Sequence, residues 1–162
     1  MCIRDSVITS LLEAGYRYFG AGGALGFDTL AAQAVLQLRT EYPQIRLILV
    51  LPCKEQTRGW LAADVDTYIE ILHQADKVVY TAEHYYRGCM FKRNRHLVDN
   101  SSVCICYLTS DHGGTAYTVR YAQSQQLRLS IWPTAYRLSF PFRRLRFQFT
   151  AILGISEPVS LN

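Results

Sequence analysis

Residues 20–28 constrain the fold of this chain more than any other stretch, because dense glycine there separates a predicted strand from a predicted helix. The segment is Gly-Ala-Gly-Gly-Ala-Leu-Gly-Phe-Asp. An apolar and aromatic run at residues 16–19 precedes it, and apolar residues at helical spacing follow it as far as Leu38. Strand, glycine turn and helix in this order let a parallel α/β sheet present backbone N–H groups to an anion. A tight turn that binds no ligand is the alternative.

The remaining pattern predicts an α/β fold with a mostly parallel sheet. Arg46–Leu51 is an uninterrupted apolar run that ends at Pro52, which favours a strand buried on both faces. Together with residues 16–38 it forms a predicted βαβ unit. Further strands are predicted at residues 77–80, 102–108 and 127–132. Helices are predicted at residues 7–14, 64–74 and 115–125, and residues 85–99 are predicted to be a loop that enters a helix.

The charge distribution argues against a broad surface for duplex DNA. The chain carries 17 Lys and Arg against 13 Asp and Glu, a net charge of +4. Residues 1–132 hold 13 of those basic residues and 12 of the acidic ones, so most of the excess lies in residues 133–162. A nearly neutral body lacks the electrostatic footprint that duplex binding needs. No apolar run approaches the roughly 20 residues of a membrane span, which predicts a cytoplasmic protein without a membrane partner.

A second glycine turn at residues 109–115 follows the predicted strand at residues 102–108. Its Gly113, Gly114 and Thr115 come just before a predicted helix and can offer backbone N–H groups and a hydroxyl to a phosphate. Two turns of this kind, each between a strand and a helix, indicate a ligand site more specifically than either turn alone.

Two other segments are candidates for contacts with a ligand. Residues 52–60 lie just past a predicted strand and offer Gln56 and Trp60, unless Trp60 simply packs as an apolar plug. A basic stretch at residues 92–96 enters a predicted helix, where cations oppose the helix dipole unless an anion lies there. A solvated helical face is the alternative. Five cysteines without a Cys-x-x-Cys pair predict no metal site.

Five motifs follow one another along the chain: Gly20-x-Gly-Gly-Ala-Leu-Gly-Phe-Asp-Thr-Leu-Ala31, Leu51-Pro-Cys53, Gly88-Cys-Met-x-x-Arg-Asn-Arg95, Val98-Asp-x-Ser-Ser102 and Gly113-Gly-Thr-x-x-Thr-Val119. They resemble the YpsA-like proteins of the SLOG superfamily, the Rossmann-like domains related to DNA-processing protein A and the LOG phosphoribohydrolases. The resemblance covers about residues 7–132. It implies a Rossmann-like three-layer sandwich and a site for a nucleotide-derived ligand similar to ADP-ribose or NAD.

The resemblance also sets expectations for the two ends of the chain. Family members begin with a central strand that ends in a Thr-Gly-His-Arg-Pro type turn, and no segment before residue 16 matches it. We therefore expect this first strand to be missing, as in an N-terminally truncated fragment. Residues 133–162 match nothing in the family, so we expect a domain at residues 1–132 and an irregular basic and aromatic tail after it.

The leading hypothesis is a nucleotide-binding domain that acts as a sensor or regulator. Phosphate contacts are expected from the backbone of both glycine turns, charge neutralisation from two arginines, and a hydroxyl contact or helix cap from an aspartate. The expected ligand-binding residues are Gly20, Gly22, Gly23, Gly26, Asp28, Arg93, Asn94, Arg95, Gly113, Gly114 and Thr115, with Gln56, Trp60 and Thr118 as further candidates.

Two other functions stay open. A phosphoribohydrolase-like enzyme is one, although Thr118 stands where the LOG motif has its glutamate, and only Asp111 and His112 lie nearby as acid or base groups. Binding of single-stranded nucleic acid is the other, since Tyr85 and Phe91 occur among basic residues.

Overall fold

The computed structural model describes residues 3–108, 110–132 and 152–155. Its strands are β1 (Tyr18–Ala21), β2 (Arg46–Leu51), β3 (Lys77–Tyr80), β4 (Val103–Tyr107), β5 (Arg128–Trp132) and β6 (Ile152–Ile155). Its helices are α1 (Ile3–Glu13), α2 (Phe27–Leu38), α3 (Ala62–Gln74), α4 (Cys89–Asp99) and α5 (Gly114–Ser124), with a short 3-10 helix, η1, at Lys54–Thr57. Helices and strands alternate from α1 to β5, as the sequence predicts.

The described strands form one mostly parallel sheet in the order β3-β2-β1-β6-β4-β5. The pairs β1–β2, β2–β3 and β4–β5 are parallel, whereas β6 runs antiparallel to both β1 and β4. The first five strands therefore all end at the same edge of the sheet, which we call the carboxyl edge. The predicted α/β fold with a mostly parallel sheet is confirmed.

The centre of the sheet is occupied by β6, between β1 and β4. Gly154 pairs with Phe19 on one side and with Val103 on the other. This is the central position that the family resemblance assigns to an N-terminal strand. Residues 152–155 thus return to the sheet from within the segment predicted to be an irregular tail. The rest of that segment lies outside the described residues, and the domain boundary at residue 132 stays a prediction.

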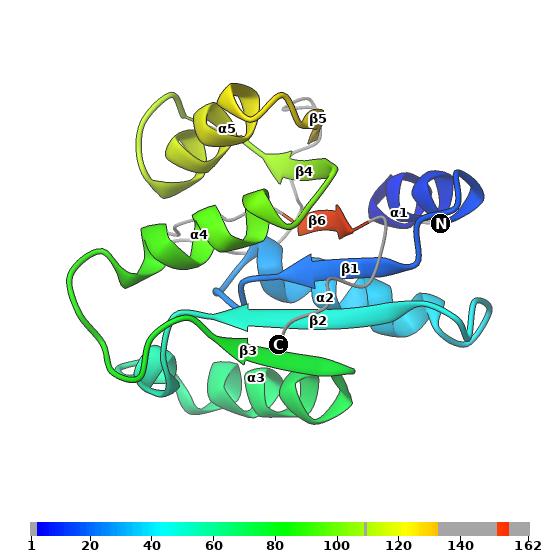
Figure 1. The fold of residues 1–162 in the computed structure, drawn as a ribbon. Helices are drawn as coiled ribbons and strands as arrows, with labels where there is room; N and C mark the ends of the chain where they lie inside the picture. Colours follow the sequence, from blue (N-terminus) through cyan, green and yellow to red (C-terminus); the bar gives the residue numbers. More distant parts are fainter. Residues whose placement is uncertain (1–2, 109, 133–151, 156–162) are drawn as a thin grey trace.

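Helices cover both faces of the sheet and give three layers (Figure 1). Helices α1, α2 and α3 pack on one face, in a core that includes Leu12, Val35 and Ile71. Helices α4 and α5 pack on the other face, where Val98 and Val119 belong to a second core. The apolar run of β2 contributes side chains to both cores, because alternate side chains of a strand point to opposite faces of the sheet. The prediction that β2 is buried on both faces is confirmed.

Several element boundaries differ from those expected by one to four residues, among them those of β1 and α1. The first strand continues through Gly20 to Ala21, so Gly20 lies inside β1, where it pairs with Ile48 of β2, and is not part of the turn. Helix α1 begins at Ile3 rather than at residue 7. Among the helices that the structure describes, none is both long enough and apolar enough to cross a membrane.

Candidate functional site

The two glycine turns lie at the carboxyl edge, where the connections after β1 and after β4 lead to opposite sides of the sheet. After β1 the chain passes through α2 to β2, on one side, and after β4 it passes through α5 to β5, on the other. Because α2 and α5 cover opposite faces of the sheet, the two connections separate at this point. Open α/β sheets bind ligands in the crevice outside such a switch point. One strand, β6, separates β1 from β4 here.

The first glycine turn closes over a buried arginine. The carbonyl oxygen of Gly22 accepts hydrogen bonds from Arg93 Nη1 and, at 3.2 Å, from Gln56 Nε2. A Cβ atom on Gly22 would lie 2.5 Å from Arg93 Cζ, which no real Cβ tolerates. Gly23 and Gly26 have φ angles of 66° and 90°, a region that favours glycine. The three glycines of the turn therefore each have a structural reason for lacking a side chain.

Arg93 and Asp28 form a buried ion pair beneath this turn. Arg93 is 2% exposed and Asp28 0%, and Arg93 Nη1 lies 3.8 Å from Asp28 Oδ2. The same carboxylate oxygen accepts a hydrogen bond from the backbone N–H of Ala24 at 3.2 Å. Burial lowers the pKa of Arg93 and the negative charge of Asp28 opposes that effect. The pair thus links the first turn of α2 to α4 from inside the protein.

Asn94 and Thr118 connect α4 to the start of α5. Asn94 Nδ2 donates to Thr118 Oγ1 at 2.8 Å, and that hydroxyl donates to the carbonyl oxygen of Gly114 at 2.9 Å. Both side chains are buried, with 4% and 1% exposure. Thr118, one of the further candidates for ligand contact, therefore has its hydroxyl engaged in holding two helices together.

Arg95 points away from the first glycine turn and toward α5. Its Nε donates to the hydroxyl of Tyr117 at 2.5 Å, and its guanidinium lies 5.6 Å from the ring centroids of both Tyr117 and Tyr121. One turn further along α4, Asp99 accepts a hydrogen bond from the Tyr121 hydroxyl at 2.8 Å, which raises the pKa of that tyrosine. The two arginines predicted to bind the ligand together therefore lie apart: Arg93 contacts the first glycine turn, and Arg95 contacts α5.

The second glycine turn is open. Gly113 has a φ of 92° and precedes α5 without a side-chain hydrogen bond to cap the helix among the described residues. A Cβ atom on Gly114 would meet nothing within 4 Å, and Gly114 does not have a positive φ. Neither packing nor backbone conformation accounts for glycine at position 114. Thr115 is 8% exposed in the first turn of the helix.

The second glycine turn also places a histidine beside a carboxylate, just before Gly113. His112 Nδ1 lies 2.9 Å from Asp111 Oδ1 and 2.8 Å from Ser110 Oγ. The side chains of Asp111 and His112 are almost fully exposed. The hydrogen bond from His112 lowers the pKa of Asp111. Ser110 Oγ also lies 3.3 Å from His112 Nε2, so the serine hydroxyl is within reach of both ring nitrogens of this exposed histidine.

A cavity of about 590 Å³ lies beside the first glycine turn. Its lining combines Gln56, which bonds to Gly22, with Met90, whose sulfur lies 4.0 Å from Arg93 Nη2. The other lining residues are Glu55, Arg58, His84 and Tyr85. Its volume falls in the range of small-molecule sites. Trp60, also predicted for this region, instead packs edge-on against Tyr68 with ring centroids 5.6 Å apart.

The structure thus brings together Gly22, Asp28, Arg93 and Gln56 at one turn, and Asn94 and Thr118 at the other. The sequence analysis did not predict that Arg93 is buried. Arg93 lies four residues from both Cys89 and Leu97, so the three side chains share one face of α4, and this spacing could have indicated its burial. No comparable pattern in the sequence indicates that Met90 and Tyr85 line the cavity beside the first glycine turn. Within the described residues no group of three or more His, Cys, Asp or Glu side chains is arranged to hold a metal ion.

Comparisons with known proteins agree with this architecture. The YpsA family model, described as the YspA SLOG family, matches residues 1–133. The chain is 29% identical over 140 residues to the uncharacterized SPbeta prophage-derived protein YoqJ of Bacillus subtilis, covering 78% of this chain and 82% of that protein.

Two further relatives carry the designation UPF0398. The chain is 31% identical over 125 residues to UPF0398 protein BH1768 of Halalkalibacterium halodurans, covering 75% of this chain and 66% of that protein. It is 29% identical over 130 residues to a UPF0398 protein of Bacillus thuringiensis, covering 76% of this chain and 71% of that protein. The predicted resemblance is confirmed, and the chain belongs to the YspA SLOG family.

Proposed function

We propose that this protein binds a nucleotide-derived ligand of the ADP-ribose or NAD type at the carboxyl edge, as a sensor or regulatory domain in the cytoplasm. The observation that carries the proposal is Gly114. It lacks a side chain although nothing within 4 Å would meet one and its backbone does not require glycine. Glycine at the start of a helix allows a phosphate to approach the backbone N–H groups closely.

The separation of the two turns supports an extended ligand. One strand lies between β1 and β4, so the turns that follow them are two strand spacings apart, about 10 Å. A single phosphate is too small to contact both. A ligand with a pyrophosphate and a ribose can extend from one turn to the other, and the 590 Å³ cavity beside the first turn can take a further part of it.

The proposal gives the predicted residues different roles. Backbone groups of both turns contact the ligand, whereas Asp28 and Arg93 shape the first turn from beneath because both are buried. Asn94 and Thr118 fix the start of α5. Binding is favoured over phosphoribohydrolase chemistry because the Thr118 hydroxyl is buried and hydrogen-bonded to its neighbours, and a hydroxyl there cannot replace the acid or base group that a glutamate supplies.

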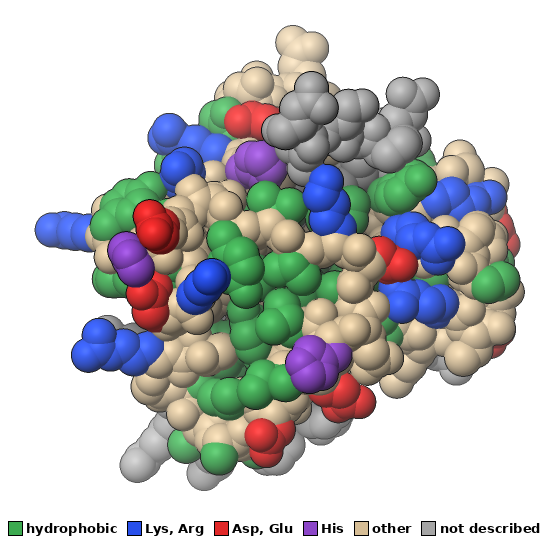
Figure 2. Space-filling view, turned by 60° about the horizontal axis from the view of Figure 1, so that its bottom comes forward, with side chains coloured by type: hydrophobic (Ala, Val, Ile, Leu, Met, Phe, Trp, Pro, Cys, Tyr) green, Lys and Arg blue, Asp and Glu red, His purple; other side chains and the backbone are tan. Residues whose placement is uncertain are grey.

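Single-stranded nucleic acid stays an alternative prediction. Tyr85 and Phe91 are 64% and 45% exposed, which suits base stacking. On the face seen in Figure 2, however, Lys and Arg side chains lie in several separate groups around a hydrophobic centre and do not merge into one basic track.

Isothermal titration of the full chain with ADP-ribose, NAD and cyclic nucleotides is expected to give saturable heat with at least one of them. Gly114→Ala is expected to weaken that binding about tenfold or more, because its methyl group occupies the space that a phosphate needs and removes a charge-assisted contact. Gln123→Ala, at an exposed position of the same helix, is the matched control and should bind like the wild type. Absence of heat with every ligand would overturn the proposal.

A further inference from the structure

A second cavity, of about 600 Å³, lies between the outer side of α4 and the end of β3. It is separate from the cavity beside the first glycine turn, and no described residue lines both cavities. Its lining residues are Val79, Tyr80, Thr81, Gly88, Phe91, Lys92, Arg95, His96 and Asp99. We call it the α4–β3 cavity.

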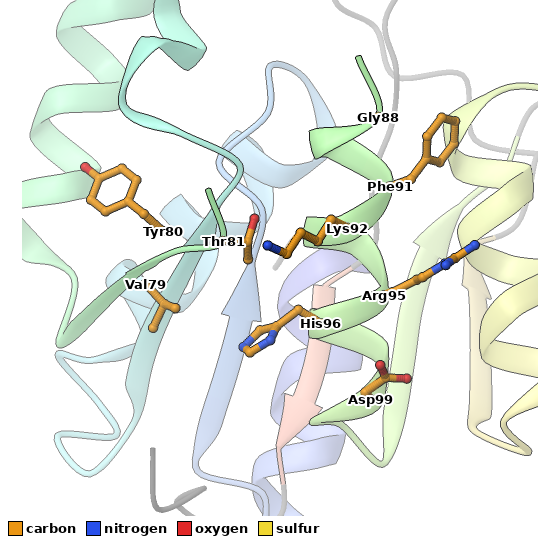
Figure 3. Close-up of a pocket in the computed structure, with 9 residues that line it drawn as sticks. All are labelled: Val79, Tyr80, Thr81, Gly88, Phe91, Lys92, Arg95, His96 and Asp99. Carbon is orange, nitrogen blue, oxygen red and sulfur yellow. The ribbon is translucent and has the colours of Figure 1, made fainter. Parts of the chain in front are cut away.

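The charged and histidine side chains of α4 that line this cavity divide into two groups (Figure 3). Lys92 and His96 extend from the helix toward the β3 side, with the Lys92 ammonium directed toward Thr81. Arg95 extends toward α5, where it bonds to Tyr117. Asp99 likewise bonds to a tyrosine of α5. The space that faces β3 is therefore lined by Lys92 and His96, while the only carboxylate among the described lining residues, that of Asp99, is engaged elsewhere.

Lys92 lacks electrostatic compensation within the described part of the protein. It lies in the first turn of α4, where the helix dipole presents partial positive charge, and that turn contains no acidic residue. No side-chain hydrogen bond caps the helix at Gly88 in that part of the chain. Arg93, its neighbour, is compensated by Asp28, but Lys92 forms no ion pair with any described residue. An anion in the α4–β3 cavity would stabilise both the lysine and the helix end.

The shape and lining of the cavity indicate which anion it takes. A volume of about 600 Å³ is much larger than an inorganic oxyanion needs, and Val79 contributes an apolar wall opposite α4. We propose that the α4–β3 cavity is a second binding site for a small organic phosphate, with the phosphate at Lys92 and His96 and the organic group against Val79. This site is independent of the ligand proposed for the carboxyl edge.

The test is a titration of the full chain with phenyl phosphate, followed by the amide NMR signals of Gly88, Lys92 and His96. We expect saturable changes at these amides with phenyl phosphate, weaker ones with inorganic phosphate and none with benzyl alcohol. Lys92→Met should weaken phenyl phosphate binding about tenfold or more, because it removes a charge-assisted contact. Lys92→Met should leave any heat with ADP-ribose unchanged.

Lys54→Met is the matched control, since it makes the same substitution at an exposed lysine that does not line the α4–β3 cavity. It should change phenyl phosphate binding less than about threefold, because Lys54 is not among the residues that contact the proposed phosphate position. Equal losses for Lys92→Met and Lys54→Met would show a nonspecific charge effect and overturn the proposal. Absence of saturation, or binding of a dT oligonucleotide without binding of phenyl phosphate, would overturn it as well.

Discussion

Gly22→Ala is expected to lower the free energy of unfolding by about 3–5 kcal/mol. The new Cβ would lie 2.5 Å from Arg93 Cζ and 2.8 Å from Asp28 Oδ2, and closer still to Arg93 Nη1. Arg93 would have to move, and because it is almost fully buried it cannot move without leaving the Asp28 carboxylate in the interior with a weakened partner. Small domains are stable by only about 5–15 kcal/mol, so this loss is a large fraction of the total.

Urea denaturation of the wild type, Gly22→Ala and Gly114→Ala measures this effect. Alanine at position 114 meets nothing within 4 Å in the first turn of a helix, so its free energy of unfolding should stay within about 1 kcal/mol of the wild type or rise slightly. Similar unfolding curves for Gly22→Ala and the wild type would show that the contact between the first glycine turn and Arg93 does not limit stability.

Arg93→Met is expected to cost about 3–5 kcal/mol of unfolding free energy, because it leaves the fully buried Asp28 without its cation. Arg95→Met removes the same charge two residues away, but Arg95 is exposed, and its loss should cost less than about 1 kcal/mol. The contrast between the two variants separates the effect of the buried pair from the effect of net charge on α4.

A double-variant cycle tests the Arg93–Asp28 pair directly. Asp28→Asn should also destabilise the protein, since it leaves the arginine buried without its ion-pair partner. The double variant Asp28→Asn/Arg93→Met should lose less than the sum of the two single losses, because neither charge is then left alone. Strict additivity, or an Arg93→Met variant that is no less stable than Arg95→Met, would contradict the role given to the pair.

The sequence predicts the layer structure of this protein well, because local patterns specify it. The apolar run of β2 and the helical spacing from Phe27 onward depend only on neighbours within one element, and both elements occur where expected. The two glycine turns are also placed correctly at the carboxyl edge. Their positions follow from the order of strand, turn and helix, which any parallel sheet orients in the same way.

Long-range contacts could not be predicted in the same way. Arg93 and Gly22 are 71 residues apart, and their hydrogen bond depends on how α4 lies across the sheet. The burial of Arg93 could have been inferred from its spacing to Cys89 and Leu97, but its partner could not. No pattern in the sequence predicts β6 or its position in the sheet, because four residues carry too little periodicity to indicate a strand or its neighbours.

Arg95 is a residue within a single motif whose contacts the sequence analysis also did not predict. The sequence places it beside Arg93 and Asn94 and suggests one shared phosphate contact. Two residues along a helix lie on nearly opposite sides, so Arg93 enters the interior while Arg95 reaches the tyrosines of α5. Helical geometry applied to the motif is sufficient to assign the two arginines to different sides of α4.

Amide-resolved NMR of the full chain during a titration with ADP-ribose tests the proposed nucleotide site most directly, because it locates binding as well as detecting it. We expect saturable changes concentrated at residues 22–26 and 113–115, with smaller ones at Gln56 and Tyr85 around the adjacent cavity. Changes confined to other surfaces, or no saturable change at either glycine turn, would contradict the assignment of a nucleotide site to the carboxyl edge.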